Sequence, residues 1–170
     1  MDFFDIVKPF NKHYLNVDKI HEIYIEEYGN KDGIPIVFLH GGPGAGTSPL
    51  YQKFFDPSKY HLIMFDQRGS GKSKPYGEII ENTTPNLISD IDKILDFLKL
   101  DSVHIYGGSW GSTLALLYAE SNPDRVLSLL LRGVFLCRKN DIQWFYQFGA
   151  SEIYPNYWEN YISLVQPSKG

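Results

Sequence analysis

The sequence has 170 residues, with 16 lysines and arginines against 20 aspartates and glutamates, so its formal net charge at pH 7 is −4. A chain with this excess of acid has no electrostatic attraction for nucleic acid or for an anionic lipid surface, and we expect neither as a partner. Hydrophobic residues make up 43% and charged residues 21%, a balance typical of a folded domain rather than a disordered chain. The one cysteine, Cys137, excludes an internal disulfide and a metal site built from several thiolates.

The N-terminal residues, Met1 to Asp5, show no basic stretch followed by an apolar run, so no signal peptide is expected. No apolar run approaches the roughly 20 residues that a membrane-spanning helix needs. The sequence therefore predicts a soluble, cytoplasmic domain, and it gives no indication of the oligomeric state.

Short β-branched and aromatic runs alternate along the chain with segments of helical periodicity. In residues 20–28, alternate side chains would lie on opposite faces of an extended chain, and both sets mix polar with apolar residues. This pattern predicts a strand with one partly solvated face. Other runs are almost continuously apolar, as is typical of strands covered on both faces in a parallel sheet. These runs are residues 34–39, 61–65, 103–106 and 126–131.

Two segments have the apolar spacing of helices. In the first, Thr84 is a candidate N-cap, Pro85 takes the first helical position, and apolar residues recur on one face over 87–98. The second extends over 110–121 and ends before Pro123. Helices between strands imply right-handed crossovers, so the predicted fold class is α/β, a doubly wound and mostly parallel sheet.

From residue 138 onward the chain changes character, because aromatic side chains crowd into a stretch without strand-forming runs. They are Trp144, Phe145, Tyr146, Phe148, Tyr154, Tyr157, Trp158 and Tyr161. We interpret this stretch as an aromatic-rich helical region, which divides the chain into residues 1–137 and residues 138–170.

The most specific motif is a G-x-S-x-G pentapeptide, Gly107-Gly108-Ser109-Trp110-Gly111, which lies between a predicted strand and a predicted helix. A strand that turns sharply into a helix strains the backbone of the middle residue and leaves no room for side chains at the flanking glycines. The hydroxyl of Ser109 would then stand clear of the backbone near a helix N-terminus, as the nucleophile of an acyl-transfer enzyme does. The alternative is a glycine-rich turn with an incidental serine, and the strand–turn–helix context disfavours it.

A second glycine-rich segment, His40-Gly41-Gly42-Pro43-Gly44, follows the predicted strand 34–39. A tetrahedral oxyanion needs two preorganised donors, and we expect them to be the backbone N–H groups of Trp110 and Gly42. Both loops would lie at the carboxyl ends of strands, where open α/β sheets bind ligands. We expect His40 to orient its loop through hydrogen bonds rather than to act as a general base.

The segment Asp66-Gln67-Arg68-Gly69-Ser70-Gly71 also follows a predicted buried strand. We expect it to form a scaffold in which Asp66 and Arg68 fix the backbone, rather than to take part in catalysis. It looks like the end of a phosphate-binding P-loop, but Asp66 occupies the position of the required first glycine. Residues 42–46 miss the dinucleotide fingerprint, because Thr47 occupies the place of its third glycine. No nucleotide cofactor is expected.

Taken together, these motifs resemble those of the proline iminopeptidases (prolyl aminopeptidases), serine peptidases of the α/β-hydrolase fold. The blocks at 40–44 and 107–112 fit many α/β hydrolases, whereas the block at 66–73 is more particular to this family. Equally particular are Trp144-Phe145-Tyr146-Gln147 and Gly149-Ala150-Ser151.

The resemblance implies release of N-terminal proline from peptides, without metal or organic cofactor. Carried over by position, Ser109 would be the nucleophile, and Gly42 and Trp110 the oxyanion donors. The aromatic stretch after Arg138 looks like the start of the family's helical cap, which closes over the proline ring. A flat, aromatic-lined pocket suits a pyrrolidine ring, and the mildly acidic chain suits a cationic imino terminus.

The chain departs from the family in one respect. In α/β hydrolases the catalytic residues follow the order Ser, Asp or Glu, His, but no histidine follows His104 here. The family's aspartate, histidine and amine-binding carboxylates would lie beyond Gly170, so the sequence resembles the N-terminal half of such an enzyme. Without later strands, the run 126–131 would be an apolar sheet edge prone to aggregation.

Three functions therefore stay open. The first is a proline-releasing serine peptidase represented by an incomplete chain. The second is a catalytically inactive remnant that at most binds peptides or partners. The third is a serine esterase or amidase of the same fold.

Overall fold

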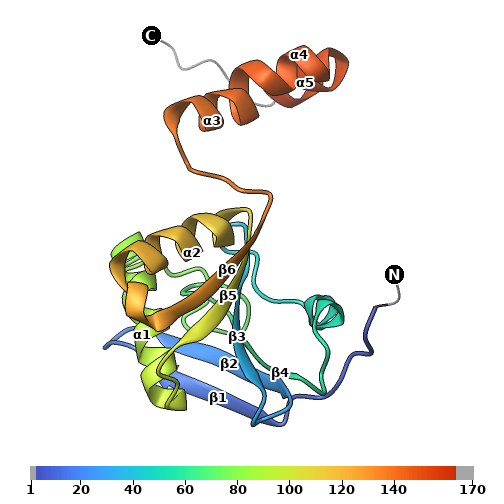
Figure 1. The fold of residues 1–170 in the computed structure, drawn as a ribbon. Coiled ribbons are helices and arrows are strands. Elements are labelled where there is room, and N and C mark those ends of the chain that lie inside the picture. Colours follow the sequence, from blue (N-terminus) through green and yellow to red (C-terminus); the bar gives the residue numbers. More distant parts are fainter. Residues whose placement is uncertain (1–2, 164–170) are drawn as a thin grey trace. The chain divides into compact units, whose positions relative to one another are not determined.

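The structure is a computed structural model that describes residues 3–163. The described chain divides into two compact units between Val134 and Phe135, and Figure 1 shows the extended segment that follows the last strand. The first unit is an α/β sheet structure, and the second is helical. No helix among the described residues is both long and apolar enough to cross a membrane.

The first unit is built on a six-stranded sheet with the order β1-β2-β4-β3-β5-β6. The strands are β1 (Asn11–Asn16), β2 (Glu22–Gly29), β3 (Ile34–Leu39), β4 (Tyr60–Phe65), β5 (Val103–Gly108) and β6 (Val126–Arg132). The pairs β1–β2 and β2–β4 are antiparallel, whereas the pairs β4–β3, β3–β5 and β5–β6 are parallel. This order and these directions confirm the predicted doubly wound, mostly parallel sheet.

All the predicted strands are present, with ends within two residues of the predicted ones. The sequence did not indicate β1, which is polar and lacks an apolar run. This strand pairs with β2 along its whole length, from Asn11 opposite Glu27 to Asn16 opposite Glu22. Its extended conformation therefore depends on the neighbouring strand and not on its own composition.

The prediction that the strand now seen as β2 has a partly solvated face is wrong. On one face, Tyr24, Glu26 and Tyr28 are each at most 8% exposed. Both tyrosine hydroxyls donate to the carboxylate of Glu26, at 2.6 Å each. On the other face, Glu27 is buried and accepts hydrogen bonds from two histidines. Polar side chains with hydrogen-bond partners of this kind can be buried at little cost in free energy. The alternation of polar and apolar residues along this strand therefore did not indicate a solvent-exposed face.

Two helices, α1 (Thr84–Leu98) and α2 (Trp110–Ser121), confirm the predicted helical segments. The N-cap of α1 is Thr83 and not Thr84, one residue earlier than predicted. Pro85 is therefore the second helical residue, a position whose N–H group also has no partner inside a helix.

The sheet has a hydrophobic core on each face. On one face, α1 and α2 cover the sheet (Figure 1), and their buried side chains form a cluster with those of β2, β3, β4 and β5. The largest fully buried side chain there is that of Tyr118 in α2. On the other face, Phe38, Met64 and Tyr106 form a smaller cluster with Phe55, which follows the short helix η1 (Pro49–Phe54).

The strand β6 forms one edge of the sheet and pairs with β5 alone among the described residues. Its side chains Leu127 and Leu130 are 56% and 61% exposed. The predicted apolar edge is therefore present in the described part of the chain.

The second unit consists of four short helical elements, which confirms a helical conformation for the aromatic-rich stretch as far as residue 163. They are α3 (Lys139–Gln143), the π-helical turn η3 (Trp144–Phe148), α4 (Gly149–Ile153) and α5 (Pro155–Ile162). A Cβ atom on Gly149 would lie 2.3 Å from a ring carbon of Trp144, so a glycine lets α4 begin against the indole. Residues 164–170 lie outside the described part.

Candidate active site

Ser109 stands alone between a strand and a helix, because β5 ends at Gly108 and α2 begins at Trp110. Its backbone angles are φ 54° and ψ −121°, a combination that is strained for a residue with a side chain. Two hydrogen bonds fix the turn: the Ser109 N–H donates to the Arg132 carbonyl at 2.9 Å, and the Ser112 N–H donates to the Ser109 carbonyl at 2.8 Å. Ser109 itself is exposed, which is the arrangement expected of a nucleophile at a sharp strand-to-helix turn.

The two outer glycines of the pentapeptide are required by close packing. A Cβ atom on Gly107 would lie 2.3 Å from the carbonyl oxygen of Gly111. A Cβ atom on Gly111 would lie 2.1 Å from the carbonyl oxygen of Leu39 in β3. No side chain fits at either position, so the glycines allow α2 to start directly behind the turn and beside β3.

The glycine-rich loop after β3 passes beside Ser109. Leu39 pairs with Gly107 across the parallel strands β3 and β5, so the chain leaves both strands at the same edge. A Cβ atom on Gly41 would lie 3.3 Å from the Cβ atom of Ser109. The next residue, Gly42, has φ 120°, a conformation that side chains rarely adopt.

Trp110 occupies the first position of α2, where a backbone N–H has no partner inside the helix. The structure thus places Gly41 beside Ser109 at the free end of α2, and Gly42 is the next residue of the same loop. Backbone N–H groups in such a place can stabilise an oxyanion without reorganisation.

Gln67, the second residue after β4, connects the three loops of this edge. Its backbone N–H donates to His40 Nε2 at 3.0 Å, and its side-chain Nε2 donates to the His40 carbonyl at 2.9 Å. The indole Nε1 of Trp110 donates to Gln67 Oε1 at 3.0 Å. The sequence placed Gln67 in a scaffolding segment without giving it a role of its own. Its position two residues after a buried strand was the available signal.

His40 is engaged at both ring nitrogens. Nε2 accepts from the backbone N–H of Gln67, so the ring proton is on Nδ1, which donates to the Gly41 carbonyl at 2.9 Å. The side chain is buried, and burial lowers the pKa of His40 despite the opposing influence of the Gly41 carbonyl and the Asp66 carboxylate. A neutral ring with both nitrogens occupied suits an orienting role and leaves no site for a proton from Ser109.

Asp66 and Arg68, on either side of Gln67, fix the backbone of this segment. The Asp66 carboxylate accepts from the backbone N–H of Thr47 at 2.7 Å and from its hydroxyl at 2.9 Å. The buried guanidinium of Arg68 binds both carboxylate oxygens of Asp90 in α1, at 2.5 and 2.7 Å, and also pairs with Asp18. These charges hold loops together and make no contact with Ser109.

In the described part of the chain, the hydrogen bonds of the histidines do not involve Ser109. Each of the five histidines of the sequence has its hydrogen-bond partners elsewhere. These pairs are His13 with Glu27, His21 with Asp18, His40 with Gly41 and Gln67, His61 with Glu27, and His104 with Ser128. Within residues 3–163, no group of three or more His, Cys, Asp or Glu side chains is arranged to hold a metal ion.

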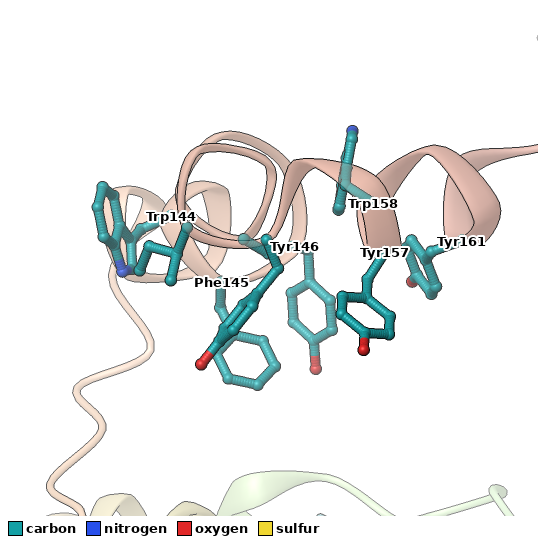
Figure 2. Close-up of a pocket in the computed structure, with 9 residues that line it drawn as sticks. Trp144, Phe145, Tyr146, Tyr157, Trp158 and Tyr161 are labelled. Atoms are coloured by element: carbon teal, nitrogen blue, oxygen red, sulfur yellow. The ribbon is translucent and has the colours of Figure 1, made fainter.

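The second unit contains an aromatic cavity of about 740 Å³, formed by its own helices (Figure 2). Side chains from η3, α4 and α5 line it, and the labelled ones are Trp144, Phe145, Tyr146, Tyr157, Trp158 and Tyr161. Several of these rings are more than half exposed, so the cavity presents an open apolar surface. Flat aromatic walls of this kind suit a small apolar ring.

The chain belongs to the family with the alpha/beta hydrolase fold, whose family model matches residues 34–167. Over nearly its whole length it is similar to proline iminopeptidases, which confirms the resemblance seen in its motifs. It is 52% identical over 163 residues to a probable proline iminopeptidase of Leptolyngbya boryana, covering 96% of this chain and 51% of that protein. It is 50% identical over 159 residues to the proline iminopeptidase of Arabidopsis thaliana, covering 94% of this chain and 42% of that protein. The chain thus spans about half the length of the curated relatives that it matches.

Solved structures support the same fold. A proline iminopeptidase-related protein of Thermus thermophilus has a TM-score of 0.62 and 27% sequence identity, covering 71% of this chain and 43% of that one. An epoxide hydrolase of Vigna radiata has a TM-score of 0.66 and 22% identity, covering 92% of this chain and 52% of that one, and at this identity it shows the fold alone.

Proposed function

We propose that this chain carries the nucleophile of a serine peptidase that releases N-terminal proline from peptides. The observation that carries the proposal is the exposed Ser109 in its strained turn, with the Gly41–Gly42 loop packed against it. The similarity to proline iminopeptidases along almost the whole chain supports this choice of substrate over others that the fold accepts.

In the proposed reaction, Ser109 Oγ attacks the carbonyl carbon of the N-terminal prolyl residue. The carbonyl oxygen takes the electron pair and accepts hydrogen bonds from the backbone N–H groups of Gly42 and Trp110. A general base takes the hydroxyl proton of Ser109 during the attack and delivers it to the leaving amine as the C–N bond breaks, and water then hydrolyses the ester to release proline and restore Ser109. Each oxyanion donor accelerates such a step by a factor of about 10²–10³.

A serine hydroxyl needs a base to become an effective nucleophile, and the histidines of this chain are engaged elsewhere. We therefore propose that the acid and the base lie on polypeptide that corresponds to the part of the relatives not spanned by this chain. Removing members of a catalytic triad lowers turnover by roughly 10⁶, so the 170 residues alone should show almost none.

The aromatic cavity of the second unit supports proline as the substrate residue. Its walls are flat rings, and a pyrrolidine ring can stack on such rings without a hydrogen-bond partner. The chain's net charge of −4 is also compatible with a cationic imino group at the substrate's N-terminus.

Hydrolysis of L-proline p-nitroanilide tests the proposal, in the chain alone and in residues 1–163 fused to the remaining half of the Leptolyngbya boryana relative. We expect turnover in the fusion, its loss in Ser109→Ala, and normal turnover in Ser121→Ala. Ser121 is a matched control because it lies at the opposite end of α2, where its hydroxyl donates to the Leu117 carbonyl at 2.8 Å.

Two other results would select the alternatives. A folded fusion without turnover would indicate an inactive remnant. An ester substrate cleaved much faster than the proline anilide, still in a Ser109-dependent way, would indicate an esterase.

A further inference from the structure

We propose that Gln67 is a positioning residue, whose side-chain amide holds the Gly42 loop and Trp110 at a fixed separation. The inference rests on the proposed function, since it concerns how the two oxyanion donors of that reaction are placed. It assigns to this side chain a role distinct from those of its neighbours Asp66 and Arg68.

Both the NH₂ group and the oxygen of the Gln67 amide form hydrogen bonds, one with a group that can only accept and the other with a group that can only donate. The NH₂ group donates to the carbonyl of His40, two residues before Gly42, and the oxygen accepts from the indole N–H of Trp110. A carbonyl only accepts and an indole N–H only donates, so flipping the amide would lose both hydrogen bonds. The residue is 2% exposed, so water cannot replace either partner readily.

The backbone on either side of Gln67 is anchored independently of its side chain. Asp66 holds Thr47 at the far end of the glycine-rich loop, and Arg68 is held by the carboxylate of Asp90. The backbone of Gln67 is therefore held in place, and its side-chain amide extends between the two loops that carry the expected oxyanion donors. Without the amide, the backbone N–H bond to His40 Nε2 is the one hydrogen bond that still links Gln67 to these loops within residues 3–163.

The position of the donors matters most in the transition state, where the charge on the oxygen develops. A displacement of about 1 Å can lower the rate about 10²-fold. Loss of the Gln67 amide should thus lower kcat and leave KM nearly unchanged. A residue that only supports folding would reduce the amount of folded protein and leave the kcat of the folded fraction intact.

The chain offers a matched control in Gln52, a second buried glutamine, whose side-chain oxygen accepts from the backbone N–H of Val7 at 3.2 Å. Gln67→Leu and Gln52→Leu each remove one buried amide, but only the first touches the loops of the site. Gln67→Glu keeps an acceptor for the Trp110 indole and loses the donor to the His40 carbonyl.

The first measurement is hydrogen exchange by NMR in the 170-residue chain, which requires no turnover. In Gln67→Leu, the indole N–H of Trp110 should exchange about tenfold faster or more, as expected for the loss of one hydrogen bond. The indoles of Trp144 and Trp158 should be unchanged, as should Trp110 in Gln52→Leu. Unchanged exchange of Trp110 in Gln67→Leu would overturn the inference.

The second measurement is the kinetics of the fusion with L-proline p-nitroanilide. We expect Gln67→Leu to lower kcat by about 10–10²-fold with KM nearly constant, Gln67→Glu to retain an intermediate kcat, and Gln52→Leu to match the parent. A parental kcat in folded Gln67→Leu would overturn the inference while the proposed function stood. Turnover that survived Ser109→Ala would overturn the proposed function instead, whatever the exchange of Trp110 showed.

Discussion

Gly111 and Leu39 approach so closely that a Cβ atom on Gly111 would lie 2.1 Å from the Leu39 carbonyl oxygen. Here the backbone of α2 contacts the backbone of β3. The start of the helix therefore lies beside the loop that follows the strand. The proximity of Ser109 to Gly41 depends on this contact.

Substitution Gly111→Ala tests this contact. We expect it to lower the free energy of unfolding by about 1–3 kcal/mol, because the backbone oxygen of Leu39 cannot move aside without shifting β3. Urea denaturation measures the change. The control is Gly108→Ala, whose Cβ atom would meet the flexible end of Arg132 at 3.2 Å. Equal stabilities for the two variants would contradict the close packing of α2 on β3.

A second prediction concerns the buried ion pair between Arg68 and Asp90, whose side chains are each 1% exposed. Asp90→Ala leaves the guanidinium buried with one carboxylate fewer, so we expect a loss of about 3–5 kcal/mol in the free energy of unfolding. Asp141→Ala removes the partner of the exposed Arg138 in the second unit and should have no measurable effect on the unfolding of the sheet unit. Chemical denaturation followed by tyrosine fluorescence compares the two, and a small effect of Asp90→Ala would contradict the anchoring role of Arg68.

A third prediction concerns the pH dependence of stability. Burial holds the pKa of His40 below its ordinary value, so near pH 6.5 the unfolded chain binds a proton that the folded chain does not. The contribution of His40 to stability is therefore complete above this pH and decreases as the pH falls below it. Nitrogen-15 NMR of the imidazole should show a neutral ring with the proton on Nδ1 at pH 7. A ring charged at that pH, or protonated on Nε2, would contradict the hydrogen bond from Gln67.

A fourth prediction concerns the edge strand β6. Lysine side chains on sheet edges oppose pairing between molecules, so Leu130→Lys should reduce aggregation of the 170-residue chain. Ile79→Lys, at an 82% exposed position in a loop, adds the same charge away from the edge. Light scattering at matched concentrations distinguishes them, and equal suppression by both variants would point to net charge instead of the edge.

The sequence predicted features whose causes are local. The strand–turn–helix at Ser109 is one of them, because Gly107 meets the backbone of Gly111 only four residues later, so the spacing of the glycines was informative. The helix α2 was predicted with its observed ends for the same reason, since Pro123 follows closely.

Other features depend on residues that are distant in the sequence. The strand β1 is stabilised by pairing with β2, and its own residues carry no apolar pattern. Burial of Glu26 requires the hydroxyls of Tyr24 and Tyr28, which no periodicity reveals. Likewise, the contacts of Gln67 arise only where three loops meet, so the sequence could place the residue near the site but not identify its partners.

The central claim is that Ser109 is the nucleophile, and covalent labelling tests it most directly. The active fusion would be treated with a fluorophosphonate, which phosphonylates activated serines, and the modified residue identified by peptide mass spectrometry. We expect one phosphonyl group on Ser109, with hydrolysis of L-proline p-nitroanilide lost in proportion to labelling. Loss of activity with Ser109 unmodified, for example with the label on Ser112, would contradict the account.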